Sequence, residues 1–177
     1  MNERGIWTTK EEIGTHVFDK ALCDAIIYMF PADKSIVDIG CGNGAYTEYL
    51  KRHLFTCDGF DGSPLTPEPC EIMDFSNPVN IGKYDIVLCL EVGEHIPQQF
   101  ERVFIKNICN TAKEWIILSW AVEGQGGTGH VNCRNNDYVV EQMWRQRFEI
   151  SRDLTDILRN KASISWFKNT LMVFKYE

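Results

Sequence analysis

Three glycines at alternate positions constrain this chain more than any other feature. They are Gly40, Gly42 and Gly44. Residues 35–39 before them include β-branched side chains and predict a short strand, and a run with helical spacing begins at Ala45. A strand that breaks into glycines and restarts as a helix brings bare backbone N–H groups and a helix N-terminus to the end of a sheet. The segment therefore predicts a nucleotide-sized binding site.

The glycine pattern alone also fits the turn of a dinucleotide-binding domain, or a structural turn whose glycines only allow close packing. Asp38 extends it to D-x-G-x-G-x-G, which resembles motif I of the class I S-adenosylmethionine-dependent methyltransferases. In that family the acidic residue holds the amino group of the methionine part, directly or through water, while the glycine backbone runs beside the ligand. The resemblance therefore implies that Asp38 and the backbone of residues 40–44, Cys41 included, contact this cofactor.

The length of 177 residues is that of one domain, in which we expect an N-terminal helical segment or lid (1–34) and a core (35–177). The hydrophobic share of 44% and the charged share of 24% are ordinary for a soluble globular protein. No apolar run approaches the roughly 20 residues of a membrane span, and the first ten residues are too polar for a signal peptide. We therefore expect a cytoplasmic protein that does not enter a membrane.

The charge of the chain indicates the class of acceptor, and its cysteines indicate their redox state and whether a metal site is expected. A balance of 18 basic to 25 acidic residues gives a formal net charge of −7, which favours a small-molecule acceptor, or a protein acceptor, over nucleic acid. Seven cysteines, several of them in apolar patterns, indicate reduced and mostly buried thiols. His130 and Cys133 are three positions apart, but no second pair of ligands lies nearby, so we expect no metal site.

The N-terminal region predicts one helix. Residues 8–30 combine a threonine pair that can cap a helix with a later run of apolar residues at helical spacing, and Pro31 ends the pattern. In the family that the chain resembles, such a segment packs beside the sheet and often closes over the ligand. Trp7 and His16 could then face the pocket, although a role in packing or on the surface explains them equally well.

A second strand is predicted over residues 54–60, and Asp61 follows at its tip. Asp61 lies 21 residues after Gly40, the distance at which an acidic residue can accept hydrogen bonds from ribose hydroxyls. The run that contains Asp61 and Gly62 also resembles motif II of the methyltransferases, which implies that both residues contact the cofactor. Asp58 is the competing acid, but it falls within the strand.

A third strand is expected to be brief. Three prolines between residues 64 and 69 exclude a regular helix, so the crossover before this strand is expected to be short. The strand covers 71–73 and leads into Asp74 and Phe75. An acid followed by an apolar residue at this place resembles the adenine site of the family, where the carboxylate accepts from the exocyclic amine. The alternative is an aspartate that initiates a turn.

A nearly continuous apolar run over residues 84–90 is typical of a central strand that is covered on both faces. The segment after it, from Glu91 to Pro97, resembles the acid-x-x-x-His-Ile/Val-Pro segment of small-molecule methyltransferases. The resemblance implies that Glu91, or the backbone next to it, contacts the methionyl side of the cofactor. It leaves two roles open for His95, which are a base near the acceptor or a hydrogen-bond partner of loop backbone.

The most unusual stretch is the glycine-rich loop, residues 121–133. Four of its glycines fall within six positions, and such a composition costs conformational entropy on ordering. We interpret the loop as an acceptor-binding loop in which His130 and Asn132 project polar groups, with Trp120 or Glu123 at its base. A polar, flexible connector is the alternative.

The remaining elements complete the sheet. Helices are predicted over residues 98–112, 138–147 and 153–160, and strands over residues 115–120, 148–150, 163–167 and 170–175. With them the resemblance implies an α/β fold, a Rossmann-like three-layer sandwich around a mostly parallel seven-stranded sheet with a C-terminal antiparallel strand.

The activity that the resemblance implies is transfer of a methyl group from S-adenosylmethionine to a small molecule, or to a protein, by in-line displacement. His130 and then His95 are the candidate bases, because a neutral imidazole is available near pH 7. An alternative from another class is a catalytically inactive module that binds the cofactor as a partner subunit. A nicotinamide-dependent dehydrogenase is disfavoured by Asp38 and by the lack of a recognisable hydride-transfer constellation.

Overall fold

The predicted site lies on a sheet whose two faces are covered by helices. In residues 1–53 and 56–177, which the computed structural model describes, the strands are β1 (Ser35–Ile39), β2 (Thr56–Asp61), β3 (Glu71–Ile72), β4 (Tyr84–Leu90), β5 (Ala112–Ser119), β6 (Phe148–Ile150) and β7 (Leu171–Tyr176). The helices are α1 (Lys10–Ile13), α2 (Lys20–Met29), α3 (Ala45–Arg52), α4 (Gln98–Thr111), α5 (Asn136–Trp144), α6 (Arg152–Lys161) and α7 (Phe167–Thr170). A 3₁₀ helix, η1 (Gly93–His95), follows β4.

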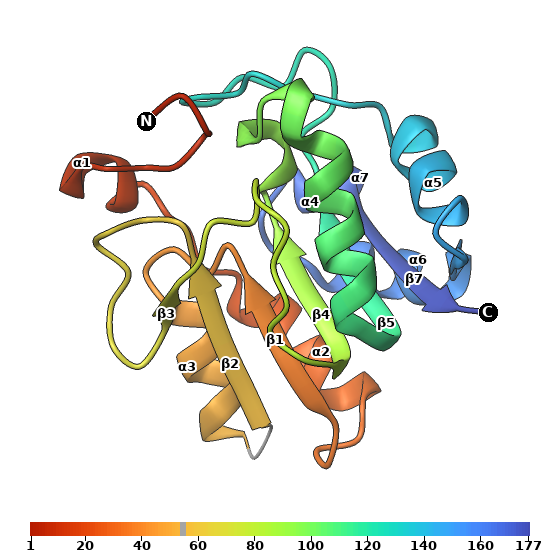
Figure 1. Cartoon of the computed structure of the whole chain (residues 1–177). Coiled ribbons are helices and arrows are strands. Elements are labelled where there is room, and N and C mark those ends of the chain that lie inside the picture. Colours follow the sequence, from red (N-terminus) through yellow and green to blue (C-terminus); the bar gives the residue numbers. More distant parts are fainter. Residues whose placement is uncertain (54–55) are drawn as a thin grey trace.

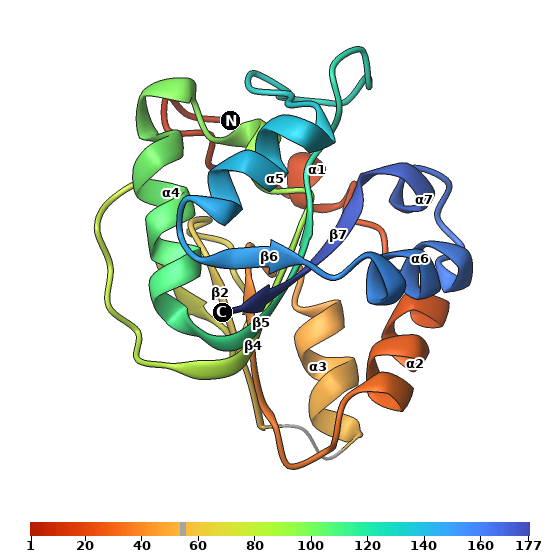
Figure 2. The same ribbon diagram turned by 90° about the vertical axis from the view of Figure 1, so that its right-hand side faces the viewer.

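The seven strands of the described chain form one sheet in the order β3-β2-β1-β4-β5-β7-β6. Strands β1 to β5 pair in parallel, whereas β7 pairs antiparallel with both β5 and β6 and therefore lies between them. Figure 2 shows α4 and α5 on one side of the sheet and α2, α3 and α6 on the other. The predicted Rossmann-like three-layer fold, with its antiparallel C-terminal strand, is confirmed.

Alternation along the central strands divides the apolar side chains between the two faces. Ile36 and Ile86 are buried in the core beneath α2, α3 and α6, whereas Val37 and Val87 are buried in the core beneath α4 and α5. Because both faces are covered, β4 is apolar at almost every position, as its sequence predicts, whereas β1 also contains Ser35 and Asp38.

Parallel pairing brings the carboxyl ends of the first strands to one edge. Asp38 of β1 lies opposite Gly59 of β2 and opposite Leu88 of β4. The N-terminal segment and the glycine-rich loop after β5, red and teal in Figure 1, both lie at the end of the sheet toward which the arrowheads of β2 and β4 point. Open α/β sheets bind their ligands at this edge.

The predicted N-terminal helix is wrong in one respect, because it is divided in two. Thr9 and Glu12 form the capping box of α1, which is only one turn long. A second cap, Asp19, starts α2 by accepting from the amide of Leu22 at 3.0 Å. The apolar periodicity did not reveal this second helix start, because Phe18, which lies before the cap, also packs against the Tyr46 ring and so fits the apolar pattern.

Other element boundaries also differ from the predictions. The predicted strand over residues 163–167 is wrong, because the amides of Ser163 and Ile164 donate to the buried Asp19 at 2.7 and 2.8 Å and so cannot form a ladder. The chain then forms α7 in place of the end of that strand. Strand β5 begins at Ala112, three residues before its predicted start. Leu54 and Phe55, predicted to begin the second strand, lie outside the described residues.

The structure can be compared with two expectations from the sequence, that the cysteines are reduced and that the chain does not enter a membrane. All seven cysteines of the chain are free, and only Cys133 is not buried. Across the part of the chain that the structure describes, no helix has both the length and the apolar character needed to cross a bilayer.

Candidate functional site

The glycine turn after β1 is tied to the end of β2. The amides of Gly40 and Cys41 donate to the carbonyl oxygen of Phe60 at 2.7 and 3.1 Å, and the amide of Gly42 donates to Asp61 Oδ2 at 2.9 Å. The prediction that backbone N–H groups are free for a ligand is therefore wrong for these three residues, because the protein itself supplies their acceptors. The glycines instead provide positive φ angles, +77° at Gly40 and +54° at Gly42, which a residue with a Cβ rarely adopts.

Asp61 is the last residue of β2, and its carboxylate lies at the predicted edge. Besides the Gly42 amide, it accepts from the Ser63 amide, at 2.8 Å to Oδ1. The competing acid, Asp58, accepts instead from the Tyr84 hydroxyl at 2.8 Å. Of the two acids, Asp61 therefore lines the pocket, next to Gly62.

Asp38 is a buried carboxyl group within β1. Its Oδ2 accepts from the Thr47 hydroxyl at 2.7 Å, and this hydroxyl belongs to the first crossover helix, α3. Burial raises the pKa of Asp38 to about 7, although the Thr47 hydrogen bond opposes this shift. The carboxyl group is therefore balanced between its two protonation states near neutral pH.

Two adjoining pockets lie at the carboxyl edge of the sheet. The first is lined by Asp61, Gly62, Asp74 and Phe75, among others. The second is lined by Asp38, Cys41, His130 and residues 125–128 of the glycine-rich loop, among others. Residues that line both are Trp7, His16, Gly40, Glu91 and His95. The structure thus gathers most of the predicted site residues around one region.

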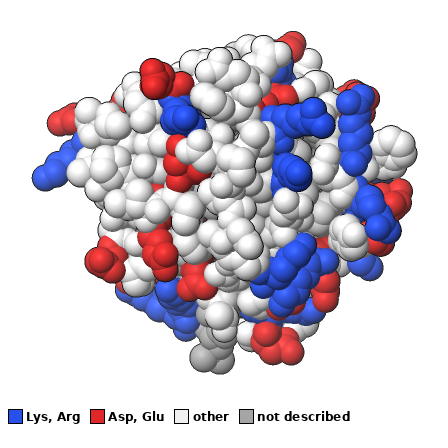
Figure 3. All heavy atoms as spheres, viewed as in Figure 1, with Lys and Arg blue, Asp and Glu red and all other residues white. Residues whose placement is uncertain are grey.

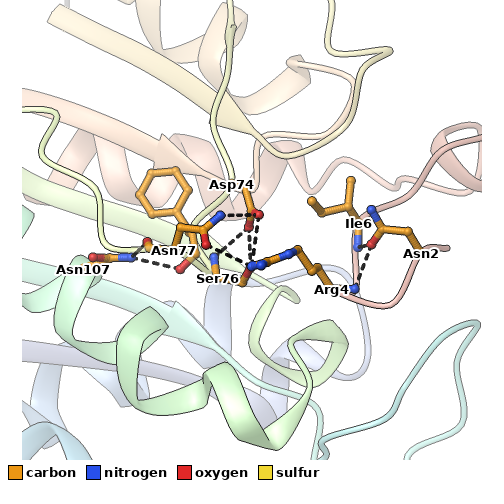
Figure 4. A network of polar contacts seen from close by, with 8 residues as sticks. Asn2, Arg4, Ile6, Asp74, Ser76, Asn77 and Asn107 are labelled. Carbon is orange, nitrogen blue, oxygen red and sulfur yellow. Dashed lines mark hydrogen bonds and ion pairs between the residues drawn. The ribbon is translucent and has the colours of Figure 1, made fainter.

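Asp74 lines the first pocket, but its carboxylate is already occupied. Its Oδ1 accepts from the amide and the hydroxyl of Ser76 at 2.8 and 2.6 Å, and its Oδ2 accepts from Asn77 Nδ2 at 2.8 Å (Figure 4). This is the arrangement of an aspartate that initiates a turn. A contact between Asp74 and adenine stays a prediction, as does one from Phe75.

Polar contacts fasten the N-terminal segment to this turn. Arg4 Nη1 donates to Ser76 Oγ at 2.8 Å and to Asn77 Oδ1 at 3.0 Å, and its guanidinium lies 3.6 Å from Asp74 (Figure 4). The same turn is also bound to α4, because Asn107 Nδ2 donates to the carbonyl oxygen of Asn77 at 2.7 Å. Residues 1–7 are therefore held across the end of the sheet.

This segment places two aromatic rings over the site. The Trp7 ring makes edge contacts with His16 and with His95, at 4.8 and 5.2 Å between ring centroids. His16 lies directly on the glycine turn, since a Cβ on Gly42 would be 1.6 Å from His16 Cε1. Within the described residues, the buried Trp7 Nε1 has no hydrogen-bond partner. Both residues face the pockets, one of the two alternatives that the sequence allowed.

Glu91 follows β4 with a φ of +54°, an uncommon angle for a residue with a side chain. Its amide donates to Ser119 Oγ at 2.8 Å, and its Oε2 accepts from Gln125 Nε2 at 3.0 Å. The side chain thereby links β4 to the glycine-rich loop. Burial raises the pKa of Glu91 above its usual value, and the hydrogen bonds oppose this shift.

His95 and His130 meet although 34 residues separate them in sequence. Their ring centroids lie 5.2 Å apart. His95 Nδ1 is 3.1 Å from the carbonyl oxygen of Gly129, and His130 Nδ1 is 3.2 Å from that of Gln125. Burial lowers the pKa of His95 to about 4, so this imidazole is neutral at pH 7. His95 thus both contacts loop backbone and faces the pocket.

The glycine-rich loop is fastened to α4, and the role predicted for Asn132 is wrong. Asn132 does not project into the pocket, because it is buried and its Nδ2 donates to Glu101 Oε2 at 2.9 Å. Trp120 lies at the base of the loop, one of the two predicted alternatives, and its Nε1 donates to the carbonyl oxygen of Asn132 at 2.7 Å in the core. Glu123 accepts from Asn135 at 3.1 Å. These contacts position the loop.

The sequence reasoning missed Glu94, which lies in η1. This residue is fully buried, and among the described residues neither of its carboxyl oxygens accepts a hydrogen bond. Its Oε1 is 3.9 Å from His130 Nε2. Burial raises the pKa of Glu94 well above its usual value. The sequence signal that could have identified Glu94 was its position directly before His95, within the Glu91–Pro97 segment that resembles the methyltransferases.

Comparisons with known proteins agree with this geometry. A family model described as "Methyltransferase domain" matches residues 14–120. A probable chloroplastic tocopherol O-methyltransferase of Oryza sativa subsp. japonica is 29% identical over 107 residues, which cover 49% of this chain and 29% of that protein. A ubiquinone biosynthesis O-methyltransferase of Vibrio parahaemolyticus is 31% identical over 80 residues, 36% of this chain and 34% of that one. The chain thus spans about a third of the length of these two relatives.

Solved structures are similar in fold. Magnesium protoporphyrin IX methyltransferase from Synechocystis PCC 6803 with bound S-adenosylhomocysteine has a TM-score of 0.64 at 18% identity, and the match covers 88% of this chain and 82% of that one. The sugar N-methyltransferase KedS8 from Streptoalloteichus has a TM-score of 0.68 at 14% identity, covering 93% and 89%. At these identities the similarity concerns the fold.

Proposed function

Because the family model spans residues 14–120, the chain belongs to the methyltransferase-domain family, and we propose that it transfers a methyl group from S-adenosylmethionine to a small-molecule acceptor. One observation carries the proposal most directly. Asp38 and Asp61, on neighbouring parallel strands, each line one of two adjoining pockets at the carboxyl edge of the sheet. An adenosyl group and an amino acid, joined through sulfur, need acidic partners at two such separated points.

The chain's own groups fit this cofactor. Asp61 would accept hydrogen bonds from the ribose hydroxyls in the first pocket, and Asp38 would pair with the amino group in the second. The indole N–H of Trp7, buried and without a partner in the described residues, is a donor available to a ligand between the pockets. When bound, S-adenosylmethionine supplies a methyl group on a positively charged sulfur, which leaves with the carbon–sulfur electron pair.

The protein's contribution to such a reaction is to align the acceptor and exclude water. The N-terminal segment, fastened through Arg4, covers the site with Trp7 and His16. His130 and His95 line the second pocket, where a neutral imidazole can accept the proton of an acceptor hydroxyl. We keep His130 first and His95 second as candidate bases. The imidazoles in this pocket favour an enzyme over an inactive binding module.

The acceptor class follows from several weaker observations. The names of the two curated relatives describe O-methyltransferases, which favours oxygen as the acceptor atom. On the face shown in Figure 3, basic and acidic side chains are interspersed, a pattern that supports a small molecule over nucleic acid. A protein acceptor is the second possibility. The free thiols suit a reducing compartment, and we propose the cytoplasm.

The experiment measures binding and turnover together. Calorimetry compares S-adenosylhomocysteine with NAD, and a coupled assay detects S-adenosylhomocysteine released from S-adenosylmethionine in the presence of phenols, other alcohols and amines. We expect the protein to bind S-adenosylhomocysteine but not NAD, and to turn over S-adenosylmethionine with a hydroxyl compound. Absence of S-adenosylhomocysteine binding would refute the cofactor assignment, and binding without turnover on any acceptor would identify an inactive module.

A further inference from the structure

Glu94, His95 and His130 form a cluster, of which the methyl-transfer proposal uses only the two histidines. One ligand atom from each, a carboxylate oxygen and two ring nitrogens, lies within 4.8 Å of the other two. Two of the residues come from η1 and the third from the glycine-rich loop, so the cluster exists only in the folded chain. His130 Nε2 lies 3.9 Å from Glu94 Oε1, too far for a hydrogen bond.

Both imidazoles turn the same nitrogen, Nδ1, toward the backbone of the glycine-rich loop. His95 Nδ1 and His130 Nδ1 lie 3.1 and 3.2 Å from the backbone carbonyl oxygens of Gly129 and Gln125. A carbonyl oxygen only accepts, so each Nδ1 carries the hydrogen, and each Nε2 of a neutral ring keeps its lone pair. Histidines that bind metal ions are typically held in this way, with the other ring nitrogen donating to a carbonyl or carboxylate.

The buried carboxyl group of Glu94 is the second observation. In the part of the chain described here, neither of its oxygens accepts a hydrogen bond, and no lysine or arginine forms an ion pair with it. A buried carboxylate without a partner is costly, and proteins balance such groups with a proton, a cationic side chain or a metal ion. Within the described residues the carboxyl group therefore has no cationic side chain as a partner, and a ring nitrogen of each histidine lies close to it.

We propose that Glu94, His95 and His130 bind one divalent transition-metal cation. Two imidazole nitrogens and one carboxylate oxygen suit Zn²⁺, Fe²⁺ or Co²⁺, whereas Mg²⁺ and Ca²⁺ prefer oxygen ligands throughout. Metal–ligand distances of about 2.0–2.1 Å place neighbouring ligand atoms roughly 3.3 Å apart. Binding therefore requires the side chains to approach one another by up to about 1.5 Å from their present positions.

Three protein ligands leave at least one coordination position open. His95 and His130 line the second pocket, so a bound cation would be within reach of the proposed acceptor site. This part of the inference rests on the proposed function. There, the cation would bind the oxygen of a hydroxyl-bearing acceptor and lower its pKa, the hydroxyl proton would pass to water, and the same oxygen would receive the methyl group. The two histidines would then act as ligands and not as bases.

The test titrates chelator-treated protein with Co²⁺ while recording its visible absorption, and with Zn²⁺ by calorimetry. We expect one equivalent of either metal to bind. Glu94→Gln and His130→Ala should each weaken binding by at least about tenfold and change the Co²⁺ spectrum. His53→Ala is the matched control, because this exposed histidine on the C-terminal side of α3 lies outside the pockets and should leave binding unchanged.

A second control addresses the neighbouring thiol. Cys133 Sγ lies 3.7 Å from His130 Nδ1, so Cys133→Ser distinguishes a site that uses sulfur. Absence of stoichiometric binding would overturn the proposal, as would binding that survives Glu94→Gln and His130→Ala or is lost only in Cys133→Ser. Thermal melting shows whether each variant folds, and two independent ligand variants keep the test valid if one does not.

Binding of S-adenosylhomocysteine is measured on the same samples. Retention of this binding in both ligand variants, together with loss of metal, supports the cation site. Normal S-adenosylhomocysteine binding without metal binding refutes the cation site alone. Metal binding without S-adenosylhomocysteine binding refutes the proposed function and the role toward the acceptor, but leaves the cation site in place.

Discussion

Asp61 Oδ2 accepts a hydrogen bond from the amide of Gly42, with 2.9 Å between oxygen and nitrogen. The contact joins the tip of β2 to the glycine turn after β1, and it uses an amide that the sequence alone left open for a ligand. Asp61 therefore has two roles available, one toward a ribose and one in holding the shape of the turn. Experiments on this residue have to separate them.

We predict that Asp61→Ala weakens S-adenosylhomocysteine binding by about ten- to a hundredfold, the range expected when a charge-assisted hydrogen bond is removed. Calorimetry measures the affinity. Asp58→Asn is the control, because Asp58 lies on the same strand and bonds to the Tyr84 hydroxyl away from the pocket. Its affinity should stay near that of the unmodified protein. Equal affinities in the unmodified protein and in both variants would show that Asp61 does not contact the cofactor.

Gly42→Val should weaken S-adenosylhomocysteine binding at least about tenfold, because a side chain at this position overlaps the His16 ring, which packs on the turn. Gly82→Ala controls for backbone strain alone. Gly82 has a φ of +87°, but a Cβ there would have no neighbour within 4 Å. A similar loss of affinity in both variants would assign the effect to general destabilisation, and melting curves would show it.

Asp38 should make stability depend on pH. Burial raises its pKa from the usual 3.8 to about 7, so between these values the folded protein holds a proton that the unfolded chain has lost. The free energy of unfolding therefore falls by up to about 1.4 kcal/mol per pH unit from this group as the pH rises from 4 to 7, and the contribution is constant above 7.

The variant that tests this is Asp38→Asn, which cannot titrate. Its free energy of unfolding, measured in urea, should rise relative to that of the unmodified protein between pH 4.5 and pH 7. A difference that does not change over this interval would contradict a raised pKa. Asparagine keeps an oxygen that can accept from the Thr47 hydroxyl, so the hydrogen bond itself is not the variable.

His130→Ala should lower turnover by about 10²- to 10⁴-fold, whether the imidazole acts as a base or as a ligand, since either role serves the acceptor. The affinity for S-adenosylhomocysteine should change much less. Steady-state rates with an accepted substrate and calorimetry on the same preparation give both numbers. Unchanged turnover would place His130 among the residues that only shape the loop.

Glu101→Ala should lower the free energy of unfolding by about 2–4 kcal/mol, because it leaves buried polar partners without an acceptor. The Glu101 carboxylate accepts from Asn132 Nδ2 at 2.9 Å, from Arg134 Nε at 2.8 Å and from the Tyr138 hydroxyl. Glu141→Ala removes only an exposed ion pair on α5 and should change stability little. Equal effects of the two substitutions would show that the Glu101 contacts add nothing.

Much of the fold followed from local pattern. The strand before Gly40, the apolar strand over residues 84–90 and the acid at the tip of β2 all lie where short-range periodicity and spacing put them. Two of the failures are instructive because each involves a distant partner. Residues 163–167 have the composition of a strand, but Asp19 binds their amides from a position more than 140 residues earlier. Asn132 is polar in a polar loop, yet Glu101 holds it in the interior.

The sequence by itself determined most of the segments that become strands and helices, and hence which edge of the sheet receives Asp38, Asp61 and Glu91. The reason is that backbone preferences and apolar periodicity act over a few residues. Only the tertiary structure decided that Trp7 and His16 cover the glycine turn, and that the buried Glu94 lies beside His130. These relationships depend on how remote segments pack against one another, and no local pattern encodes the distance between them.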